Sequence, residues 1–420
     1  MTRLEIDPSN LHAARLTPPV SKSDAQRALV LAHLTGEHAR VSLEGEPDAA
    51  LPADVRTLRR GLAVLASADG SVQDIDCADG GAPFRLLLTQ AAITPGAHVR
   101  FTGTPRLGER PHLPLLESLR ATLGAHGLTL TEGTPWPLEV RSASGRCERP
   151  VFRVSSAQSS QYASSLLLGC AALSQREGRP WSVELEGTLT SAGYLDLTLD
   201  WTRRFGFEVS QSASRLTVEG RHPPRTLPSI PGDWSSLGYL VLLAWKTGSE
   251  VERADRASAH PDLAVLRIAG AAGIHAAESA PAVLRLSGSP ARGLAASGAE
   301  CPDLLPTLAA LGLVLPAPSV FTDVGILRLK ESDRLAGIRE LVRQFGGESL
   351  LEGERLEVRG PARAPAYFEM DSRGDHRLAM SAATLAVLSG SRLTLEDPHC
   401  VEKSFPTFWA QLERLGVKLR

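Results

Sequence analysis

Six segments of the chain place serine, aspartate, glycine or cysteine beside residues that could bind anions or move protons. They are Ser21-Lys22-Ser23, Asp79-Gly80-Gly81, Ser159-Ser160-Gln161, Asp233-Trp234-Ser235-Ser236, Cys301-Pro302-Asp303 and Asp375-His376-Arg377. Ser, Asp and Gly are favoured helix N-caps, so capping explains part of the pattern, and we interpret Asp233 and Ser235 in this way. Capping does not explain Lys22 or Arg377, because a cation there faces the positive end of a helix dipole. An anion at the helix start would remove this conflict, so the segments predict a site for a polyanionic ligand.

Other basic residues occur in turn-like contexts. Two arginines, Arg106 and Arg110, lie in the Pro/Gly-rich stretch 103–111, and Lys330 and Arg334 flank the sequence Glu-Ser-Asp. Lysine is rare, since the chain has only Lys22, Lys246, Lys330, Lys403 and Lys418. A lysine kept among so many arginines suggests a place where a compact ammonium, able to lose its proton, is needed.

Two kinds of predicted helix alternate along the chain and would position these residues. The first kind is apolar nearly all round and should be buried: Asp24–Gly36, Gly81–Gly96, Ser160–Leu173, Ser235–Gly248, Leu304–Leu315 and His376–Gly390. The second kind is amphipathic and is usually followed by short alternating strands: Val55–Leu65, Pro114–Gly127, Leu195–Gly206, Leu263–Gly273, Leu335–Gly347 and Thr407–Gly416. The repeat predicts six copies of a β-α-β-α-β-β unit.

Six units are too many for one core, so we expect two domains of three units each. The Pro-rich stretch Arg221–Gly232 is typical of a linker, and a second crossing is expected at Thr17–Val20. The expected domains are residues 20–229, and residues 1–19 together with 230–420. We expect the active site in the cleft between them.

Composition excludes several classes of protein. The net charge of −2 offers no basic excess for nucleic acid or an acidic membrane. The N-terminal sequence has neither a signal-peptide run nor the character of a transit peptide, and no apolar stretch reaches membrane-spanning length. The five cysteines form no CxxC pair, which argues against structural zinc and a disulfide framework. We therefore expect a cytoplasmic enzyme. A monomer is also expected, although composition does not bear on the oligomeric state.

Nine segments, in order along the chain, resemble motifs of the 3-phosphoshikimate 1-carboxyvinyltransferase (EPSP synthase) family of enolpyruvyl transferases. They are Ser21-Lys22-Ser23 with Arg27, Gly103–Arg106 with Glu109-Arg110-Pro111, Ser159-Ser160-Gln161, Ser191 with Tyr194, Gly232-Asp233 with Ser235-Ser236, Pro302-Asp303, Lys330–Leu335, Asp375-His376-Arg377 with Ala379-Met380, and Lys403–Pro406. The resemblance implies an α/β (α+β) fold of two domains. Each would be an inside-out α/β barrel of three β-α-β-α-β-β units with buried helices.

The resemblance also implies roles for individual residues. Shikimate 3-phosphate would be bound by Lys22, Ser23, Arg27, Ser159, Ser160, Gln161, Ser191, Tyr194, Asp303 and Lys330. Phosphoenolpyruvate would be bound by Lys22, Gly81, Arg110, Gln161, Arg334, Arg377 and Lys403. Catalysis would rest on Lys22, Asp303, Glu331 and His376, with Asp303 as the base for the attacking hydroxyl and Lys22 and Glu331 moving protons at the methylene carbon. Neither a metal nor an organic cofactor is expected.

The chain departs from the family pattern at several positions. Asp79 stands where the family usually has an amide facing phosphoenolpyruvate, Ala82 replaces a hydroxyl residue, and Ile326 replaces an asparagine at the shikimate ring. These changes leave open a carboxyvinyltransferase acting on another cyclic alcohol, or a phosphate-ligand binding protein without catalysis. The related transferases of UDP-N-acetylglucosamine usually carry a cysteine in the loop that here spans Pro105–Pro111, and this loop has none. The net charge and the scarcity of lysine argue against an enzyme that processes RNA ends.

Overall fold

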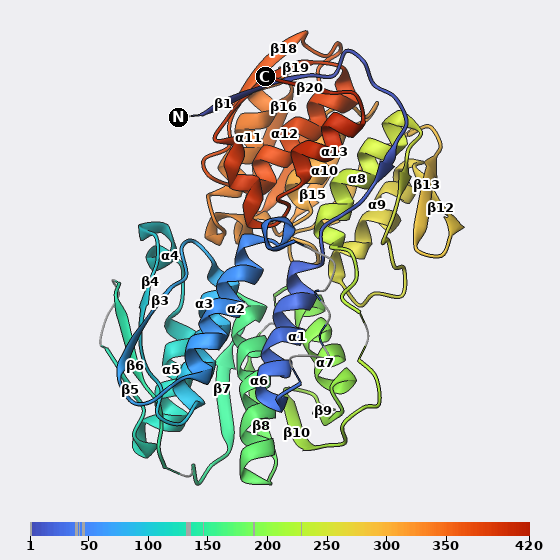
Figure 1. Cartoon of the computed structure of the whole chain (residues 1–420). Coiled ribbons are helices and arrows are strands. Elements are labelled where there is room, and N and C mark those ends of the chain that lie inside the picture. The colour runs from blue at the N-terminus through green and yellow to red at the C-terminus, as the bar shows by residue number, and fades with distance from the viewer. Residues whose placement is uncertain are drawn as a thin grey trace. The chain divides into compact units, whose positions relative to one another are not determined.

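The computed structural model describes residues 2–37, 41, 43, 47–131, 136–145, 147–187, 190–227 and 229–420 (Figure 1). The chain forms two compact units. Unit 1 consists of Met1–Ser21, Glu46–Ala53 and Pro231–Arg420, and unit 2 consists of Lys22–Gly45 and Asp54–Ile230. Unit 1 thus includes the short segment Glu46–Ala53, which the expected boundaries placed within 20–229.

Five sheets of the described residues share one arrangement of four strands. In each sheet one edge strand runs parallel to its neighbour, and the other two pairs of neighbouring strands are antiparallel. Unit 2 has two of these sheets, with strand orders β3-β4-β6-β5 and β7-β8-β10-β9. Their bounds are β3 (Val72–Asp76), β4 (His98–Thr102), β5 (Thr129–Leu130), β6 (Leu138–Arg141), β7 (Val151–Ser155), β8 (Trp181–Glu186), β9 (Phe207–Ser212) and β10 (Arg215–Arg221).

Unit 1 has the other three sheets, with strand orders β2-β11-β13-β12, β14-β15-β17-β16 and β18-β19-β1-β20. The start of the chain supplies β1 (Arg3–Asp7) and β2 (Arg15–Leu16). The remaining strands are β11 (Glu250–Val251), β12 (His275–Ala280), β13 (Val283–Ser287), β14 (Ala295–Ser297), β15 (Ser319–Thr322), β16 (Glu348–Glu352), β17 (Arg355–Arg359), β18 (Tyr367–Asp371), β19 (Arg392–Glu396) and β20 (Lys418–Leu419).

Helices connect the strands in the predicted order. Unit 2 contains α1 (Lys22–Thr35), α2 (Ala53–Ala66), α3 (Gly81–Ile93), α4 (Pro105–Glu109), α5 (Leu113–Leu123), α6 (Ser160–Glu177) and α7 (Ala192–Arg204); the first residue of α2, Ala53, belongs to unit 1. Unit 1 contains α8 (Trp234–Thr247), α9 (Ala264–Ala272), α10 (Leu305–Gly312), α11 (Arg334–Gln344), α12 (His376–Ser389) and α13 (Phe408–Arg414). Short 3-10 helices are η2 (Asp48–Ala50), η3 (Gly124–His126), η4 (Pro261–Leu263), η5 (Val324–Leu329) and η6 (Pro398–Lys403). Every predicted helix is present, and the β-α-β-α-β-β repeat is confirmed for five units; the sixth, with α1 and α2, includes residues outside the described ranges.

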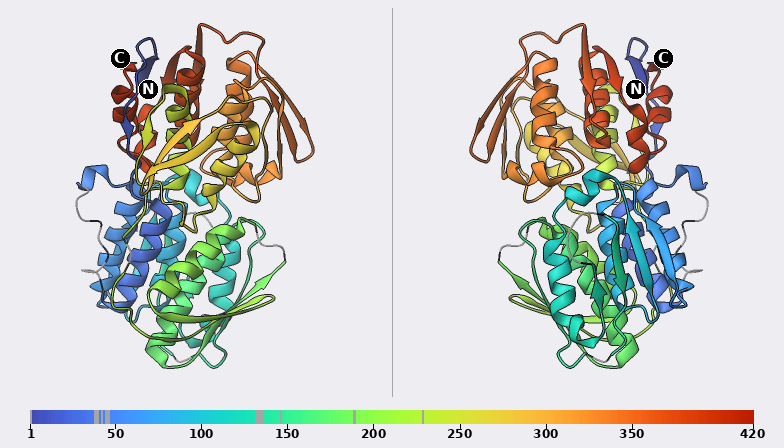
Figure 2. Two further views of the ribbon diagram at one scale, coloured as in Figure 1. Left: turned by 90° about the vertical axis from the view of Figure 1, so that its right-hand side faces the viewer. Right: turned by 90° about the vertical axis from the view of Figure 1, so that its left-hand side faces the viewer.

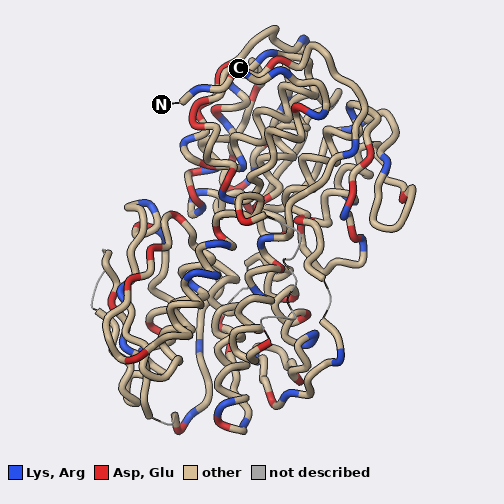
Figure 3. The backbone as a smooth tube through the Cα atoms, viewed as in Figure 1, with Lys and Arg blue, Asp and Glu red and all other residues tan. Residues whose placement is uncertain are grey.

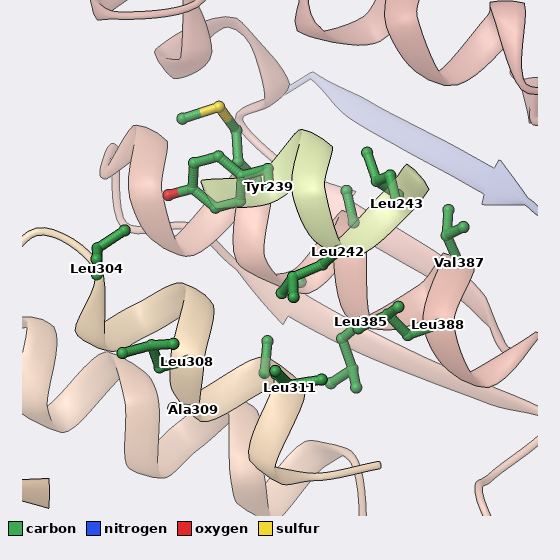
Figure 4. Close-up of a cluster of buried hydrophobic side chains, with 14 of the residues drawn as sticks. Tyr239, Leu242, Leu243, Leu304, Leu308, Ala309, Leu311, Leu385, Val387 and Leu388 are labelled. Atoms are coloured by element: carbon green, nitrogen blue, oxygen red, sulfur yellow. The ribbon is translucent and has the colours of Figure 1, made fainter. Parts of the chain in front are cut away.

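The apolar helices form the centre of each unit. In unit 1, α8, α10 and α12 pack against one another, and Figure 4 shows Leu242, Leu311 and Leu385 from these three helices in one buried cluster. In unit 2, α6 packs against both α1 and α3. Full burial of a leucine contributes about 1.5–3 kcal/mol, which explains why helices that are apolar all round occupy these positions.

The sheets lie at the periphery of each unit, as both views of Figure 2 show. Strands such as β18 alternate exposed and buried residues, so one face of the sheet covers the helices and the other meets solvent. Figure 3 shows acidic and basic residues interspersed along the chain, in agreement with the small net charge. No helix in the described ranges is both long and apolar enough to cross a membrane. The mixed α/β fold predicted from the repeat is confirmed.

Candidate active site

The start of α1 in unit 2 carries a buried guanidinium with neutral hydrogen-bond partners. Arg27 donates from Nη1 to the carbonyl of Ser23 at 2.8 Å, from Nη2 to the carbonyl of Tyr194 at 2.8 Å, and from Nε to Thr198 Oγ1 at 2.8 Å. Burial lowers the pKa of Arg27 to about 10, against the smaller opposing effects of Asp24 and Tyr194. A buried cation held by neutral oxygens is suited to binding an anion.

Lys22 opens α1 and forms an ion pair with a residue that the sequence did not single out. Its Nζ donates to Asp54 Oδ2 at 3.0 Å, and the two side chains are only 12% and 6% exposed. The charge conflict at this helix start, which predicted a bound anion, is therefore met in part by a carboxylate of the protein itself.

The first turn of α6 holds the second group of predicted residues. Ser159 is the N-cap, and its Oγ accepts from the backbone N–H of Gln161 at 3.2 Å. Ser160 is buried. The side chain of Gln161 accepts from Nη1 of Arg85 at 2.6 Å, so Arg85 fixes the orientation of a glutamine predicted to touch both substrates.

The start of α7 lies close to Arg27 through shared hydrogen bonds. Ser191 is the N-cap in a left-handed conformation (φ 56°), and its carbonyl accepts from the N–H of Tyr194 at 3.1 Å. Thr198 Oγ1 donates to the carbonyl of Tyr194 at 2.9 Å and accepts from Arg27. These bonds join the predicted residues of α1 and α7 into one network.

The start of α3 is covered by Arg110. A Cβ atom added at Gly81 would lie 2.3 Å from Nη1 of Arg110, so glycine is needed for this close approach. The guanidinium therefore lies over the first turn of a helix whose N–H groups point outward. This combination of backbone donors and a cation is suited to phosphate or carboxylate.

Asp303 is the centre of the predicted residues in unit 1. Its Oδ1 accepts from Nη1 of Arg334 at 2.8 Å and its Oδ2 accepts from Nη2 of Arg377 at 2.9 Å. Lys330 Nζ lies 3.8 Å from Oδ1. Burial alone would favour the neutral acid, but the charges of Arg377, Lys330 and Arg334 outweigh it and hold the pKa of Asp303 well below its usual range.

Arg334 contacts three carboxylates and is only 1% exposed. Besides Asp303, it donates to Glu331 Oε2 at 2.7 Å and to Asp375 Oδ2 at 2.8 Å. Burial opposes its charge, yet Asp375, Glu331 and Asp303 together raise the pKa of Arg334. The arginine is therefore a permanent cation.

Asp375 joins this cluster to the start of α12. It is fully buried, caps α12 by accepting from the N–H of Arg377 at 2.9 Å, and also accepts from Ser332 Oγ at 3.0 Å. His376 is fully buried in the same first turn. Lys403 is buried at the end of η6, which packs against α12. Unit 1 thus presents a dense set of cations whose charges are balanced by acidic side chains.

The family model of EPSP synthase (3-phosphoshikimate 1-carboxyvinyltransferase) matches residues 6–412 of this chain. The chain belongs to the EPSP synthase family. The 3-phosphoshikimate 1-carboxyvinyltransferase of Methanopyrus kandleri is 31% identical, with 99% of each chain covered. That of Halobacterium salinarum is 30% identical, with 98% of each chain covered. The solved EPSP synthase of Acinetobacter baumannii has a TM-score of 0.73 at 20% identity, with 100% of both chains covered, and shows the same fold.

Two clusters of side chains thus emerge, the hydrogen-bonded residues at the helix starts of unit 2 and the ion pairs around Asp303 in unit 1. The EPSP synthase resemblance predicted most residues of both clusters, but not the residues that hold them in place. No role was predicted for Asp54, Arg85 or Thr198, although each forms a hydrogen bond with a predicted residue. Asp375 was noted in a helix opening and in a family motif, but no role was predicted for it, and its bond to Arg334 was not foreseen. Nothing in the described ranges groups three or more His, Cys, Asp or Glu side chains as a metal would require.

Asp79 offers a test of the departure from the EPSP synthase family pattern. It lies in the turn before α3, two residues from Gly81, whose added Cβ would approach the guanidinium of Arg110. We predict that Asp79→Asn tightens binding of phosphoenolpyruvate roughly two- to tenfold, as expected when a like charge a few ångströms away is removed near a protein surface. Isothermal titration calorimetry would measure the dissociation constant.

The matched control for Asp79 is Asp76→Asn, on the neighbouring strand end. Asp76 is exposed, and its Oδ1 accepts from the N–H of Ala78 at 2.8 Å, a role that asparagine can keep. The control should bind like the wild type. Unchanged or weaker binding by Asp79→Asn would show that its carboxylate does not face the ligand.

Proposed function

We propose that this chain transfers the enolpyruvyl group of phosphoenolpyruvate to the 5-hydroxyl of shikimate 3-phosphate, releasing phosphate. The observation that carries the proposal is the EPSP synthase family match over residues 6–412. The two clusters of buried cations agree with it, because both substrates are polyanions and each cluster offers several charge-assisted donors.

The groups of unit 2 are assigned mainly to shikimate 3-phosphate. Arg27 would bind its carboxylate, since a buried guanidinium with neutral partners gains most from an anion. The start of α6, with Ser159 and Ser160, would bind its phosphate together with Ser191 and Tyr194. Lys22, Ser23 and Gln161 complete the contacts.

Phosphoenolpyruvate is assigned to the remaining cations. Arg110 over the first turn of α3, with Gly81, would take one anionic group, and Arg334, Arg377 and Lys403 would take the other. Asp303 and Lys330 would meet the ring hydroxyls of shikimate 3-phosphate. The proposal requires residues of both units to act on the same pair of substrates.

The reaction proceeds by addition and elimination. A proton adds to the methylene carbon of phosphoenolpyruvate, and the 5-hydroxyl oxygen attacks C2 while its proton passes to a base. The resulting tetrahedral intermediate loses phosphate, and the new methyl group returns one proton to restore the double bond. We assign Asp303 as the base, Lys22 and Glu331 to proton transfer at the methylene carbon, and His376 as a further catalytic group.

Phosphate release tests the proposed function. Purified protein is supplied with phosphoenolpyruvate alone, with phosphoenolpyruvate and shikimate 3-phosphate, and with phosphoenolpyruvate and UDP-N-acetylglucosamine. We expect phosphate, and a product heavier than shikimate 3-phosphate by one enolpyruvyl group, only in the second mixture. Release that does not require shikimate 3-phosphate, or none in any mixture, would contradict the proposal. That the protein is a monomer and that it is cytoplasmic both stay predictions. Light scattering would measure the oligomeric state.

A further inference from the structure

The loop that carries Arg110 is held by hydrogen bonds to the residue that directly follows Arg110. The carbonyl of Pro111 accepts from Nη2 of Arg85 at 3.0 Å and from the hydroxyl of Tyr162. Arg85 belongs to α3 and Tyr162 to α6, so two central helices of unit 2 fix this side of the loop.

Hydrogen bonds also hold the loop at Leu107, three residues before Arg110. The carbonyl of Leu107, within α4, accepts from the backbone N–H of Arg110 at 3.3 Å and from Nε2 of His112 at 2.7 Å. The indole of Trp136 lies against Gly108, where an added Cβ would approach within 2.4 Å of the ring. His112 therefore supplies the shorter of the two bonds to Leu107 in the turn that leads into Arg110.

The surroundings of His112 suit a neutral donor. The imidazole is 4% exposed and packs edge-on against Phe84, with ring centroids 4.7 Å apart. Burial and the charge of Arg85, with a smaller effect of Arg110, lower the pKa of His112 to about 3, although the bond to Leu107 acts in the opposite direction. The ring is thus uncharged at neutral pH, and because a carbonyl only accepts, Nε2 carries the hydrogen.

We propose that His112 is a positioning residue for Arg110, holding the Leu107 carbonyl so that the guanidinium stays over the first turn of α3. The proposal rests on the proposed function, in which Arg110 binds phosphoenolpyruvate. A lysine or arginine could also donate to Leu107, but its charge would repel Arg85 and Arg110. A residue without a donor would leave α4 held at this point by the backbone bond alone.

Two substitutions separate the hydrogen bond from the packing. His112→Phe keeps an aromatic ring beside Phe84 and removes the donor, whereas His112→Gln keeps an N–H that can reach the Leu107 carbonyl. We expect the phenylalanine variant to raise KM for phosphoenolpyruvate about five- to tenfold, with KM for shikimate 3-phosphate changed less than about twofold, as for loss of one hydrogen bond. The glutamine variant should recover most of this loss.

The matched control is His126→Gln, at the other end of α5 within η3. This residue has no proposed part in binding, and its variant should match the wild type in both KM values. Wild-type KM for phosphoenolpyruvate in His112→Phe would overturn the proposal. So would an equal rise in both KM values, because it would indicate a general structural defect.

A second measurement decides the matter if His112→Phe does not fold. The imidazole nitrogen resonances of the wild-type protein, assigned by their loss in the glutamine variant, should show the Nε2–H tautomer without titration between about pH 5 and 8. A titrating ring, or hydrogen on Nδ1, would overturn the proposal. These resonances need no turnover, so failure of the proposed function, seen as no phosphate release by the wild type, is distinguishable from failure of this inference.

Discussion

An Asp303→Asn variant is expected to turn over about 100- to 10,000-fold more slowly than the wild type, the usual cost of losing a general base. In the structure Asp303 gives one oxygen to Arg334 and the other to Arg377. Despite burial, the charges of Arg377, Lys330 and Arg334 hold its pKa well below the usual range, so in this state the carboxylate is a weak base. The anionic groups of phosphoenolpyruvate would compete for the same arginines, and their arrival would return basicity to Asp303.

The same substitution should strengthen anion binding. A neutral amide competes less well than a carboxylate for two guanidinium groups, so affinity for inorganic phosphate should rise while turnover falls. Steady-state kinetics and phosphate titration calorimetry measure the two effects on one sample. Loss of turnover with unchanged or weaker phosphate binding would show that Asp303 does not compete for the arginines, and turnover within tenfold of the wild type would remove it from the role of base.

The control for Asp303 is Asp333→Asn. Asp333 caps α11 by accepting from the N–H of Ala336 at 3.0 Å, and asparagine can keep this cap. Its side chain is 39% exposed and lies 3.6 Å from Arg328, outside the Asp303 cluster. This variant makes the same chemical change close in sequence to Lys330 and should leave turnover and phosphate binding near wild-type values.

Lys22→Met is expected to reduce turnover to a similar extent, about 100- to 10,000-fold. The variant keeps the length of the side chain and removes the ammonium that opens α1, assigned both to substrate binding and to proton transfer. It also leaves Asp54, which is buried, without the cation 3.0 Å away. Loss of one partner of a buried ion pair lowers the free energy of unfolding, so lost activity alone would not separate a chemical role from a folding defect.

A double variant separates these causes. Lys22→Met with Asp54→Asn removes both charges, so it should unfold at a higher temperature than Lys22→Met while remaining equally inactive. Lys418→Met, on an exposed strand end, is the control for losing a lysine and should retain wild-type turnover. If the double variant regains activity, or if Lys22→Met is active, Lys22 has no role in the chemistry.

Much of the fold could be predicted because the relevant signals are local. The apolar run that becomes α3 and the alternation that becomes β16 and β17 depend on neighbouring residues alone. The helix starts also drew attention to Lys22 and Arg377, because a cation in the first turn is unusual. Most of the other site residues were predicted only from the resemblance to the EPSP synthase family. The parallel pairing of β2 with β11 was not predictable in this way, since Arg15 and Glu250 meet only through the tertiary fold.

The residues that hold the site residues in place were also missed, because their contacts join parts of the chain that are distant in sequence. Arg85 reaches Gln161 across 76 positions of sequence and Arg377 reaches Asp303 across 74, and no local pattern marks such pairs. From the sequence alone, the cations at helix starts predict a bound anionic ligand. The structure shows that Asp54, Asp303 and Asp375 provide part of that negative charge, so the ligand must compete with carboxylates of the protein.

We propose that residues of both units act on one pair of substrates. A crystal structure of the protein with shikimate 3-phosphate and an unreactive analogue of phosphoenolpyruvate tests it most directly. We predict one shikimate 3-phosphate molecule whose carboxylate contacts Arg27, whose phosphate contacts Ser160, and whose 5-hydroxyl lies within hydrogen-bonding distance of Asp303. A ligand bound by one unit alone, with Asp303 still paired to Arg334 and Arg377, would contradict it.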